Sequence, residues 1–237
     1  MFRFAQSLLA VGLIALAGCG SITINDDARI IVYGDSMLAW NSASGRSAPD
    51  RLAKIIGEPI QNQSVVAAHF SNALNAFLDI RRQRRAGDWD LVIVNGGAND
   101  LFFECGCGPC SGVVNRLIAE NGLSGEIPSF IKSLRLEGAQ VVFVGYHRRR
   151  NLIGPAQGCA DELDELDRRV ERLAQIDEGF TFVSLSNVFT PGDASFYTFD
   201  RIHPSPRGSL AIARMMAEPV RAALARGRLG RGPADGG

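Results

Sequence analysis

The heptapeptide Ile30-Ile-Val-Tyr-Gly-Asp-Ser36 decides the fold and holds the first candidate reactive group. Its apolar residues form a short continuous run, which is typical of a strand covered on both faces of a parallel sheet. Gly-Asp-Ser and a helical pattern follow directly, so Ser36 is predicted at the carboxyl edge of the sheet, beside a helix N-terminus. Alone the motif is weak, because a serine in this position is more often only a helix cap.

Similar apolar runs alternate with helical patterns along the chain. This alternation predicts parallel strands joined by crossover helices. The expected fold is α/β, a doubly wound three-layer α/β/α arrangement with a parallel sheet of about five strands. The predicted strands are 30–33, 60–66, 91–94, 141–144 and 180–185, and the predicted helices are 72–85, 129–138, 161–176 and 206–226. Two connections, 96–112 and 145–160, are predicted to be long functional loops.

The composition is that of one ordinary globular domain. The chain has 237 residues, of which 46% are hydrophobic and 21% charged, so it can bury one substantial core. Lysines and arginines number 25, as do aspartates and glutamates. Without a net basic field, no nucleic-acid partner is predicted.

The N-terminus resembles the export signal of bacterial lipoproteins. A basic start and a short apolar run lead to Leu16-Ala-Gly-Cys19, and the run is too short for a membrane span. We expect residues 1–18 to be the signal peptide and Cys19 to carry the lipid, although a plain signal with an incidental cysteine is the alternative. Several acyl chains would hold the protein on a membrane. Glycine after Cys19 favours the outer membrane of the bacterial envelope, with the protein facing the periplasm.

The remaining boundaries follow from composition. Residues 19–28 are predicted to be a lipidated linker, residues 29–226 the folded domain, and residues 227–237 a disordered tail with little to bury.

Four cysteines remain after Cys19. They are Cys105, Cys107, Cys110 and Cys159, an even number that predicts two disulfides in an exported protein. Three pairings exist, and a Cys105–Cys107 bond is disfavoured because one intervening residue strains disulfide geometry. A zinc site with four thiolates is the alternative.

Two further segments carry candidate reactive groups. Leu91-Val-Ile-Val-Asn-Gly-Gly-Ala-Asn-Asp100 is a strand that ends in glycines and places the Asn99 amide at the same sheet edge as Ser36. Asp200 and His203 stand three residues apart before the last helix. This spacing lets the carboxylate accept from Nδ1 of the imidazole and leaves Nε2 to take a proton. Asp193 is the next candidate carboxylate.

Together, the three segments resemble the SGNH subset of GDSL hydrolases from about Arg29 to Leu224. The resemblance implies that Ser36 is the nucleophile, His203 the general base and Asp200 its orienting carboxylate. It also implies an oxyanion hole made by the N–H of Ser36, the Asn99 amide and one further backbone N–H. The family usually has a glycine at that last position, whereas this chain has Ala67 in Asn62-Gln-Ser-Val-Val-Ala-Ala68. Ala67 can replace the glycine if its φ is not positive.

The chemistry that this resemblance implies is hydrolysis of an acyl ester, of a lipid or an O-acylated glycan, without metal or cofactor. A non-catalytic lipoprotein that binds acylated glycan or lipid is one alternative, and an acyltransferase acting on a sugar is another. The run His147-Arg-Arg-Arg150 is interpreted as a solvated loop, or else as a site for an anionic head group. His69 is interpreted as a packing or helix-start residue, and Trp40 as a core residue.

Overall fold

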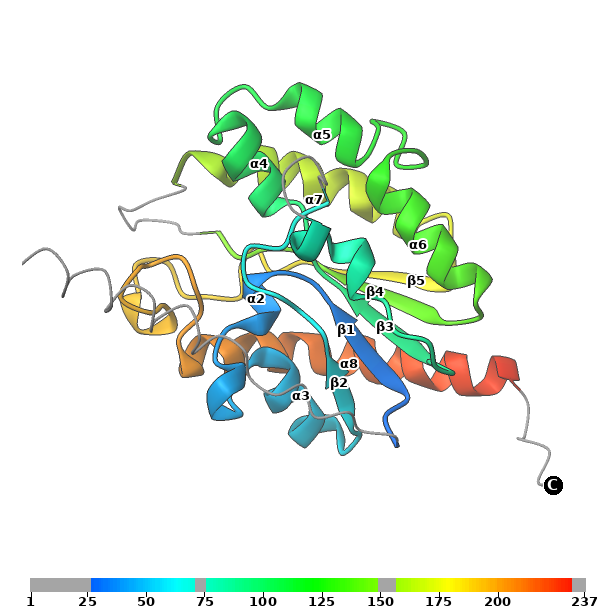
Figure 1. The fold of residues 1–237 in the computed structure, drawn as a ribbon. Coiled ribbons are helices and arrows are strands. Elements are labelled where there is room, and N and C mark those ends of the chain that lie inside the picture. Colours follow the sequence, from blue (N-terminus) through cyan, green and yellow to red (C-terminus); the bar gives the residue numbers. More distant parts are fainter. Residues whose placement is uncertain (1–26, 71–75, 149–156, 232–237) are drawn as a thin grey trace, which may run out of the picture.

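The computed structural model describes residues 27–70, 76–148 and 157–231 (Figure 1). The predicted signal peptide, Cys19 and most of the predicted linker lie outside the described residues, so the lipid anchor stays a prediction. Arg149, Arg150 and residues 232–237 lie outside them as well. Within the described ranges, no helix combines the length and the apolar character that a membrane crossing needs.

Five parallel strands form the sheet, as the sequence predicts. They are β1 (Ile30–Tyr33), β2 (Ile60–Asn62), β3 (Leu91–Val94), β4 (Gln140–Val144) and β5 (Phe180–Val183), in the order β2-β1-β3-β4-β5. In the register, Ile30 lies opposite Ile60 on one side and Leu91 on the other. The chain moves outward from β1 to β2 and then crosses back to β3. The carboxyl ends of β1 and β3 therefore meet at a topological switch point, where ligands bind in such sheets.

Helices cover both faces of the sheet (Figure 1). One layer contains α3 (Ala48–Ile56) and α8 (Pro206–Arg231), and the other contains α4 (Ala98–Cys105), α5 (Ser111–Leu117), α6 (Glu126–Leu136) and α7 (Ala160–Ala174). The apolar stripe of α7 is buried at Leu163, Leu166, Val170 and Leu173, as its period of three and four residues predicts. Ile176, the last residue of the helix predicted for 161–176, follows the end of α7 and is exposed.

Several predicted elements differ from the structure near polar side chains. The helix predicted for 72–85 is wrong in its described part, which forms two 3₁₀ turns, Ala76–Leu78 and Ile80–Gln83. Between them the Asp79 carboxylate accepts from the Arg81 N–H at 2.9 Å and starts a new turn. Strand β2 ends at Asn62 rather than at residue 66, because Asn62 Oδ1 accepts from the Ser64 N–H at 3.1 Å and turns the chain.

Two other boundaries are corrected. The connection 96–112 is not a loop throughout, because α4 and the start of α5 lie within it. The tail predicted to begin at residue 227 is helical up to Arg231, since α8 continues. Gly227 makes this possible: a Cβ atom there would lie 2.6 Å from the Asp90 carbonyl oxygen, so only glycine lets the helix pass so close to the segment before β3.

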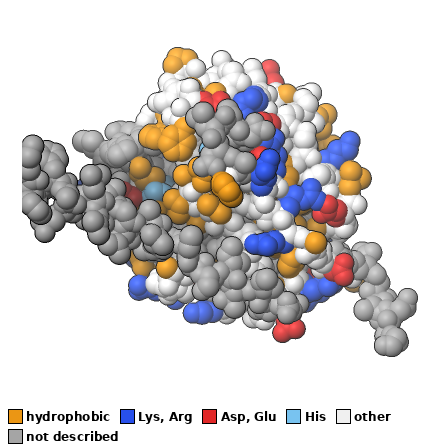
Figure 2. All heavy atoms as spheres, in the orientation of Figure 1, with side chains coloured by type: hydrophobic (Ala, Val, Ile, Leu, Met, Phe, Trp, Pro, Cys, Tyr) orange, Lys and Arg blue, Asp and Glu red, His pale blue; other side chains and the backbone are white. Residues whose placement is uncertain are grey.

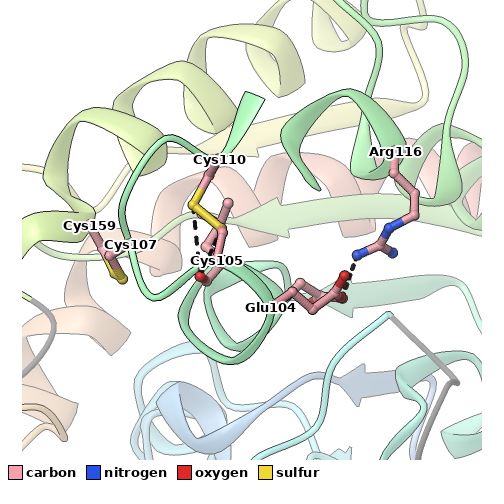
Figure 3. Close-up of a disulfide and its surroundings, with 8 residues drawn as sticks. Glu104, Cys105, Cys107, Cys110, Arg116 and Cys159 are labelled. Atoms are coloured by element: carbon pink, nitrogen blue, oxygen red, sulfur yellow. Dashed lines mark hydrogen bonds and ion pairs between the residues drawn. A yellow bond between two sulfur atoms is a disulfide. The ribbon is translucent and has the colours of Figure 1, made fainter. Parts of the chain in front are cut away.

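Two disulfides join the predicted cysteines (Figure 3). Cys105 pairs with Cys110 across the α4–α5 turn, with Cα atoms 5.6 Å apart. Cys107 pairs with Cys159, with Cα atoms 4.5 Å apart, and thereby ties the end of α4 to the start of α7. The structure thus selects one of the pairings that the sequence leaves open.

The Cys107–Cys159 bond is expected to stabilise the fold more than the Cys105–Cys110 bond. The bonds close separations of 52 and 5 residues, which corresponds to about 4 and about 2 kcal/mol on the chain-entropy estimate. Urea denaturation of the Cys107→Ser/Cys159→Ser and Cys105→Ser/Cys110→Ser proteins should show the larger loss of unfolding free energy for the first. Equal losses would contradict the assignment of the long-range bond.

Candidate active site

Ser36 lies where β1 ends and the short helix α2 (Ser36–Ala39) begins. Asp35 caps this helix, because its Oδ1 accepts from the Met37 N–H at 2.9 Å. Gln83 holds the preceding backbone from the side: it accepts from the Gly34 N–H at 2.7 Å and donates to the Gly34 carbonyl at 2.8 Å. The turn that presents the serine is therefore fixed by hydrogen bonds on both of its sides.

A buried hydrogen bond links this turn to the ends of two neighbouring strands. The Tyr146 hydroxyl, after β4, donates to Asp35 Oδ2 at 2.5 Å and accepts from the Ala98 N–H, after β3, at 3.2 Å. Burial raises the pKa of Asp35 to about 6, although the bonds from Tyr146 and Met37 act in the opposite direction. Tyr146 was not predicted as a site residue, and its only signal in the sequence is its place two residues after a predicted strand.

Asn99 lies in the first turn of α4, at the same sheet edge. Its Nδ2 donates to the Ala68 carbonyl at 2.8 Å, and the neighbouring Asp100 accepts from the Phe70 N–H at 3.1 Å. These bonds pin the 67–70 segment to the start of α4. A side-chain amide has two N–H groups, so one remains for a ligand.

Ala67 adopts a left-handed conformation, with φ of +63°. Alanine can replace the family glycine without strain only if its φ is not positive, and Ala67 does not meet this condition. Left-handed backbone costs an alanine roughly 1–2 kcal/mol. His69 supports this conformation, because its Nδ1 lies 3.0 Å from the Ala67 carbonyl oxygen. His69 is thus a half-buried residue that supports the loop.

His203 and Asp200 are paired directly. His203 Nδ1 lies 2.6 Å from Asp200 Oδ2. The other carboxylate oxygen accepts from the N–H groups of Ile202 and His203, at 2.8 and 3.0 Å, and from the Thr198 hydroxyl at 2.8 Å. Burial alone would raise the pKa of Asp200, but these bonds outweigh it and lower the pKa to about 2. Asp200 therefore stays ionised at neutral pH.

Asp193, the other candidate carboxylate, has different partners. Its Oδ1 accepts from the Ser195 N–H at 2.9 Å, and its Oδ2 lies 3.2 Å from Arg207. Of the two aspartates, Asp200 is the one that contacts His203.

Trp40 is not a core residue, which corrects its interpretation from sequence. Its half-buried ring stacks on the His203 ring, with centroids 3.7 Å apart and planes 4° from parallel. The next residue, Asn41, has a left-handed φ of +68° and donates through Nδ2 to the Pro204 carbonyl at 3.0 Å. On the other side, His147 Nε2 lies 3.0 Å from the Ile202 carbonyl oxygen. The loop that holds His203 is thus fixed from both sides.

Arg148 is neither a solvated loop residue nor a site for an anion. Its side chain is buried, and it donates to Asp164 at 2.8 Å, to Asp167 at 2.9 Å and to the Tyr146 carbonyl at 2.6 Å. Two carboxylates neutralise its charge. Both interpretations of this segment from sequence are therefore wrong for Arg148.

One cavity of about 590 Å³ brings the predicted residues together. Ser36, Ala67, Asn99 and His203 all line it, and Asp200 contacts His203 from behind. Among the described residues, no hydrogen bond joins the Ser36 hydroxyl to the His203 ring. Such bonds are often long in the absence of substrate. No group of three or more potential metal ligands occurs in the part of the chain that the structure describes.

The cavity thus holds a hydroxyl, a carboxylate-paired imidazole and amide donors at the switch point of a parallel sheet, which are the kinds of group that acyl transfer uses. Residues 32–211 match the model of the GDSL-like Lipase/Acylhydrolase family. The chain belongs to this family and is an esterase by class, which confirms the resemblance found in the sequence.

Solved structures share the fold. A carbohydrate acetylesterase family member from Sinorhizobium meliloti is 16% identical, with 83% of this chain and 98% of that chain covered and a TM-score of 0.59. A protein from Slackia heliotrinireducens, described as "a putative SGNH hydrolase", is 24% identical, with coverage of 81% and 98% and a TM-score of 0.53. A protein from Lactobacillus plantarum is 18% identical, with coverage of 84% and 99% and a TM-score of 0.60. No curated protein matches the sequence.

The conformation of Ala67 yields a stability prediction. Ala67→Gly should raise the unfolding free energy by about 0.5–1 kcal/mol, because relief of left-handed strain exceeds the extra entropy of glycine in the unfolded chain. Ala68→Gly is the matched control, since Ala68 is buried and its φ is not left-handed. This control should lose stability. Urea denaturation measures the unfolding free energies of the two variants. A loss of stability in Ala67→Gly would contradict the conclusion that Ala67 is strained.

The buried carboxyl of Asp35 yields a pH prediction. Its pKa of about 6 in the folded state lies above the ordinary aspartate value of 3.8. The folded state therefore keeps a proton that the unfolded state releases between pH 3.8 and 6. The free energy of unfolding should therefore fall as pH rises from about 4 to 6, by roughly 3 kcal/mol for about two pKa units. Asp35→Asn cannot titrate and should lack this part of the slope. Denaturation at pH 4, 5, 6 and 7 tests it, and parallel curves for parent and variant would refute it.

Proposed function

We propose that the protein hydrolyses an acyl ester through an acyl-enzyme on Ser36. The Ser36 oxygen attacks the ester carbonyl carbon while His203 takes the hydroxyl proton. As the carbon–oxygen bond of the ester breaks, His203 returns that proton to the leaving alcohol. A water molecule, deprotonated by His203, then attacks the acyl-enzyme and releases the acid and free Ser36.

The observation that carries this proposal is the hydrogen bond between Asp200 and His203, because His203 lines the same cavity as Ser36. Asp200 occupies Nδ1, which leaves Nε2 as the nitrogen for the serine proton. Because its carboxylate is held by three further hydrogen bonds, Asp200 orients the imidazole and stabilises its charged form. Trp40 restricts the ring from its face.

Three donors are proposed for the oxyanion. They are the N–H groups of Ser36 and Ala67 and the second N–H of the Asn99 amide. The three residues line the same cavity, and the bond from Asn99 to the Ala68 carbonyl sets the distance between two of them. Loss of one such donor typically lowers the rate by about a hundredfold or more.

Ser36→Ala should lower kcat for a chromogenic short-chain ester by at least about a thousandfold, because it removes the nucleophile. The variant should keep the parent's circular dichroism spectrum and denaturation midpoint. Ser129→Ala, at an exposed position of α6 that does not line the cavity, is the matched control and should keep full activity. A Ser36→Ala protein with activity within tenfold of the parent would refute the role of Ser36.

The same assay distinguishes the alternative roles. With a sugar or simple alcohol added as acceptor, an acyltransferase would release the chromophore faster and form a new ester. A binding protein would release none. The proposed esterase releases free acid at a rate that the acceptor does not increase.

A further inference from the structure

The cavity beside Ser36 is larger than an acetyl group requires. Its volume of about 590 Å³ falls in the range of roughly 300–1,000 Å³ that small-molecule sites span. A chain of about eight carbons needs roughly 240 Å³ if each carbon takes about the room of a water molecule, ~30 Å³. The cavity therefore has space for such a chain together with the ester group.

One wall of the cavity is aromatic. Phe102 and Phe103 of α4 both line it, with exposed fractions of 40% and 62%. Their rings lie edge to face, with centroids 5.3 Å apart. Val66 and Leu163 add further apolar surface to the cavity. Figure 2 shows hydrophobic side chains at the surface around a histidine, at the left of the view. A hydrocarbon chain along this wall would remove apolar surface from water.

The charged groups of the cavity do not favour an anionic ligand. Arg148 is the one arginine or lysine among the described residues that line it. Its guanidinium is bound to Asp164 and Asp167 and its side chain is only 2% exposed. Apart from the reacting groups, the lining consists of apolar side chains, this neutralised ion pair and a few polar residues, of which Asp161 is an exposed carboxylate that would repel an anion.

The walls are held together covalently. The Cys107–Cys159 bond joins the turn after α4 to the start of α7. Helix α4 carries the two phenylalanines, and α7 carries Ala160 and Leu163. Figure 3 shows this bond between Cys107 and Cys159. The bond therefore fixes the separation of α4 and α7 at this end of the cavity.

We propose that this cavity binds the acyl chain of an uncharged ester, and that the preferred chain has about eight carbons rather than the two of acetyl. The proposal rests on the proposed function, because it takes Ser36 as the atom that receives the acyl group. Burial of one methylene favours binding about fourfold, so even partial burial of the chain gives a clear preference.

Hydrolysis of p-nitrophenyl esters tests the proposal, since the alcohol stays constant while the acyl chain varies. For the parent, kcat/KM should rise at least tenfold from acetate to octanoate and fall again at palmitate. Phe103→Ala should lower the octanoate-to-acetate ratio about fivefold. Ala160→Phe, which fills the cavity from the α7 side, should lower octanoate turnover at least tenfold and leave acetate turnover within threefold.

Phe77→Ala is the matched control, because Phe77 is 88% exposed and does not line the cavity. It should leave the chain-length ratio unchanged. The proposal would be overturned if the parent preferred acetate, or if Phe103→Ala and Ala160→Phe did not alter the octanoate-to-acetate ratio. Either result would leave the esterase assignment intact.

A binding measurement separates this proposal from the proposed function. Octanamide should bind to the Ser36→Ala protein at least tenfold more tightly than acetamide in calorimetry, and Phe103→Ala should reduce the difference. If no ester is hydrolysed but this preference is found, the proposed function fails and the acyl site stands. If octanamide and acetamide bind equally, the acyl site is refuted.

Discussion

The buried hydrogen bond from Tyr146 to Asp35 joins the elements on which the site depends. Through it, and through the N–H of Ala98 that donates to the same hydroxyl, the residues after β1, β3 and β4 are linked in the interior. If the strand ends moved apart, these buried polar groups would lose their partners. Each loss would cost about 1–3 kcal/mol of stability. The switch point of the sheet brings Ser36 and Asn99 to one edge, and this bond fixes their relative position.

Residues with strained backbone lie mainly in the segments around the cavity that Ser36 lines. Four residues other than glycine have positive φ in the described parts of the chain. Three of them lie in segments of the site: Asn41 after Trp40, Ala67, and Arg201 in the loop of His203. Strained positions persist where surrounding contacts over-determine them, and they cluster at functional sites. Here the contacts are the bond of Asn41 to the Pro204 carbonyl, the contact of His69 with Ala67 and the bonds to the Asp200 carboxylate.

Sequence patterns predicted the elements whose signal is local. Strands β1 and β3 have the predicted bounds because their apolar runs end at glycine or asparagine, and the stripe of α7 has an unbroken period. The pairing of Asp200 with His203 was also accessible, because it spans three residues. The roles of Trp40 and Tyr146 were not, because a ring stacked on His203 and a hydroxyl bonded to Asp35 depend on contacts between segments distant in sequence. Cavity volume and the exposure of Phe103 likewise exist only after the layers have packed.

We propose that Ser36 is a nucleophile activated by His203 and Asp200. A fluorophosphonate probe tests it most directly, because the probe reacts covalently with an activated serine and mass spectrometry locates the adduct. We expect one adduct, on the peptide that contains Ser36. Labelling should be slowed at least a hundredfold in His203→Ala and by a smaller factor in Asp200→Asn. An adduct on another residue, or labelling of Ser36 at the parent rate in His203→Ala, would contradict it.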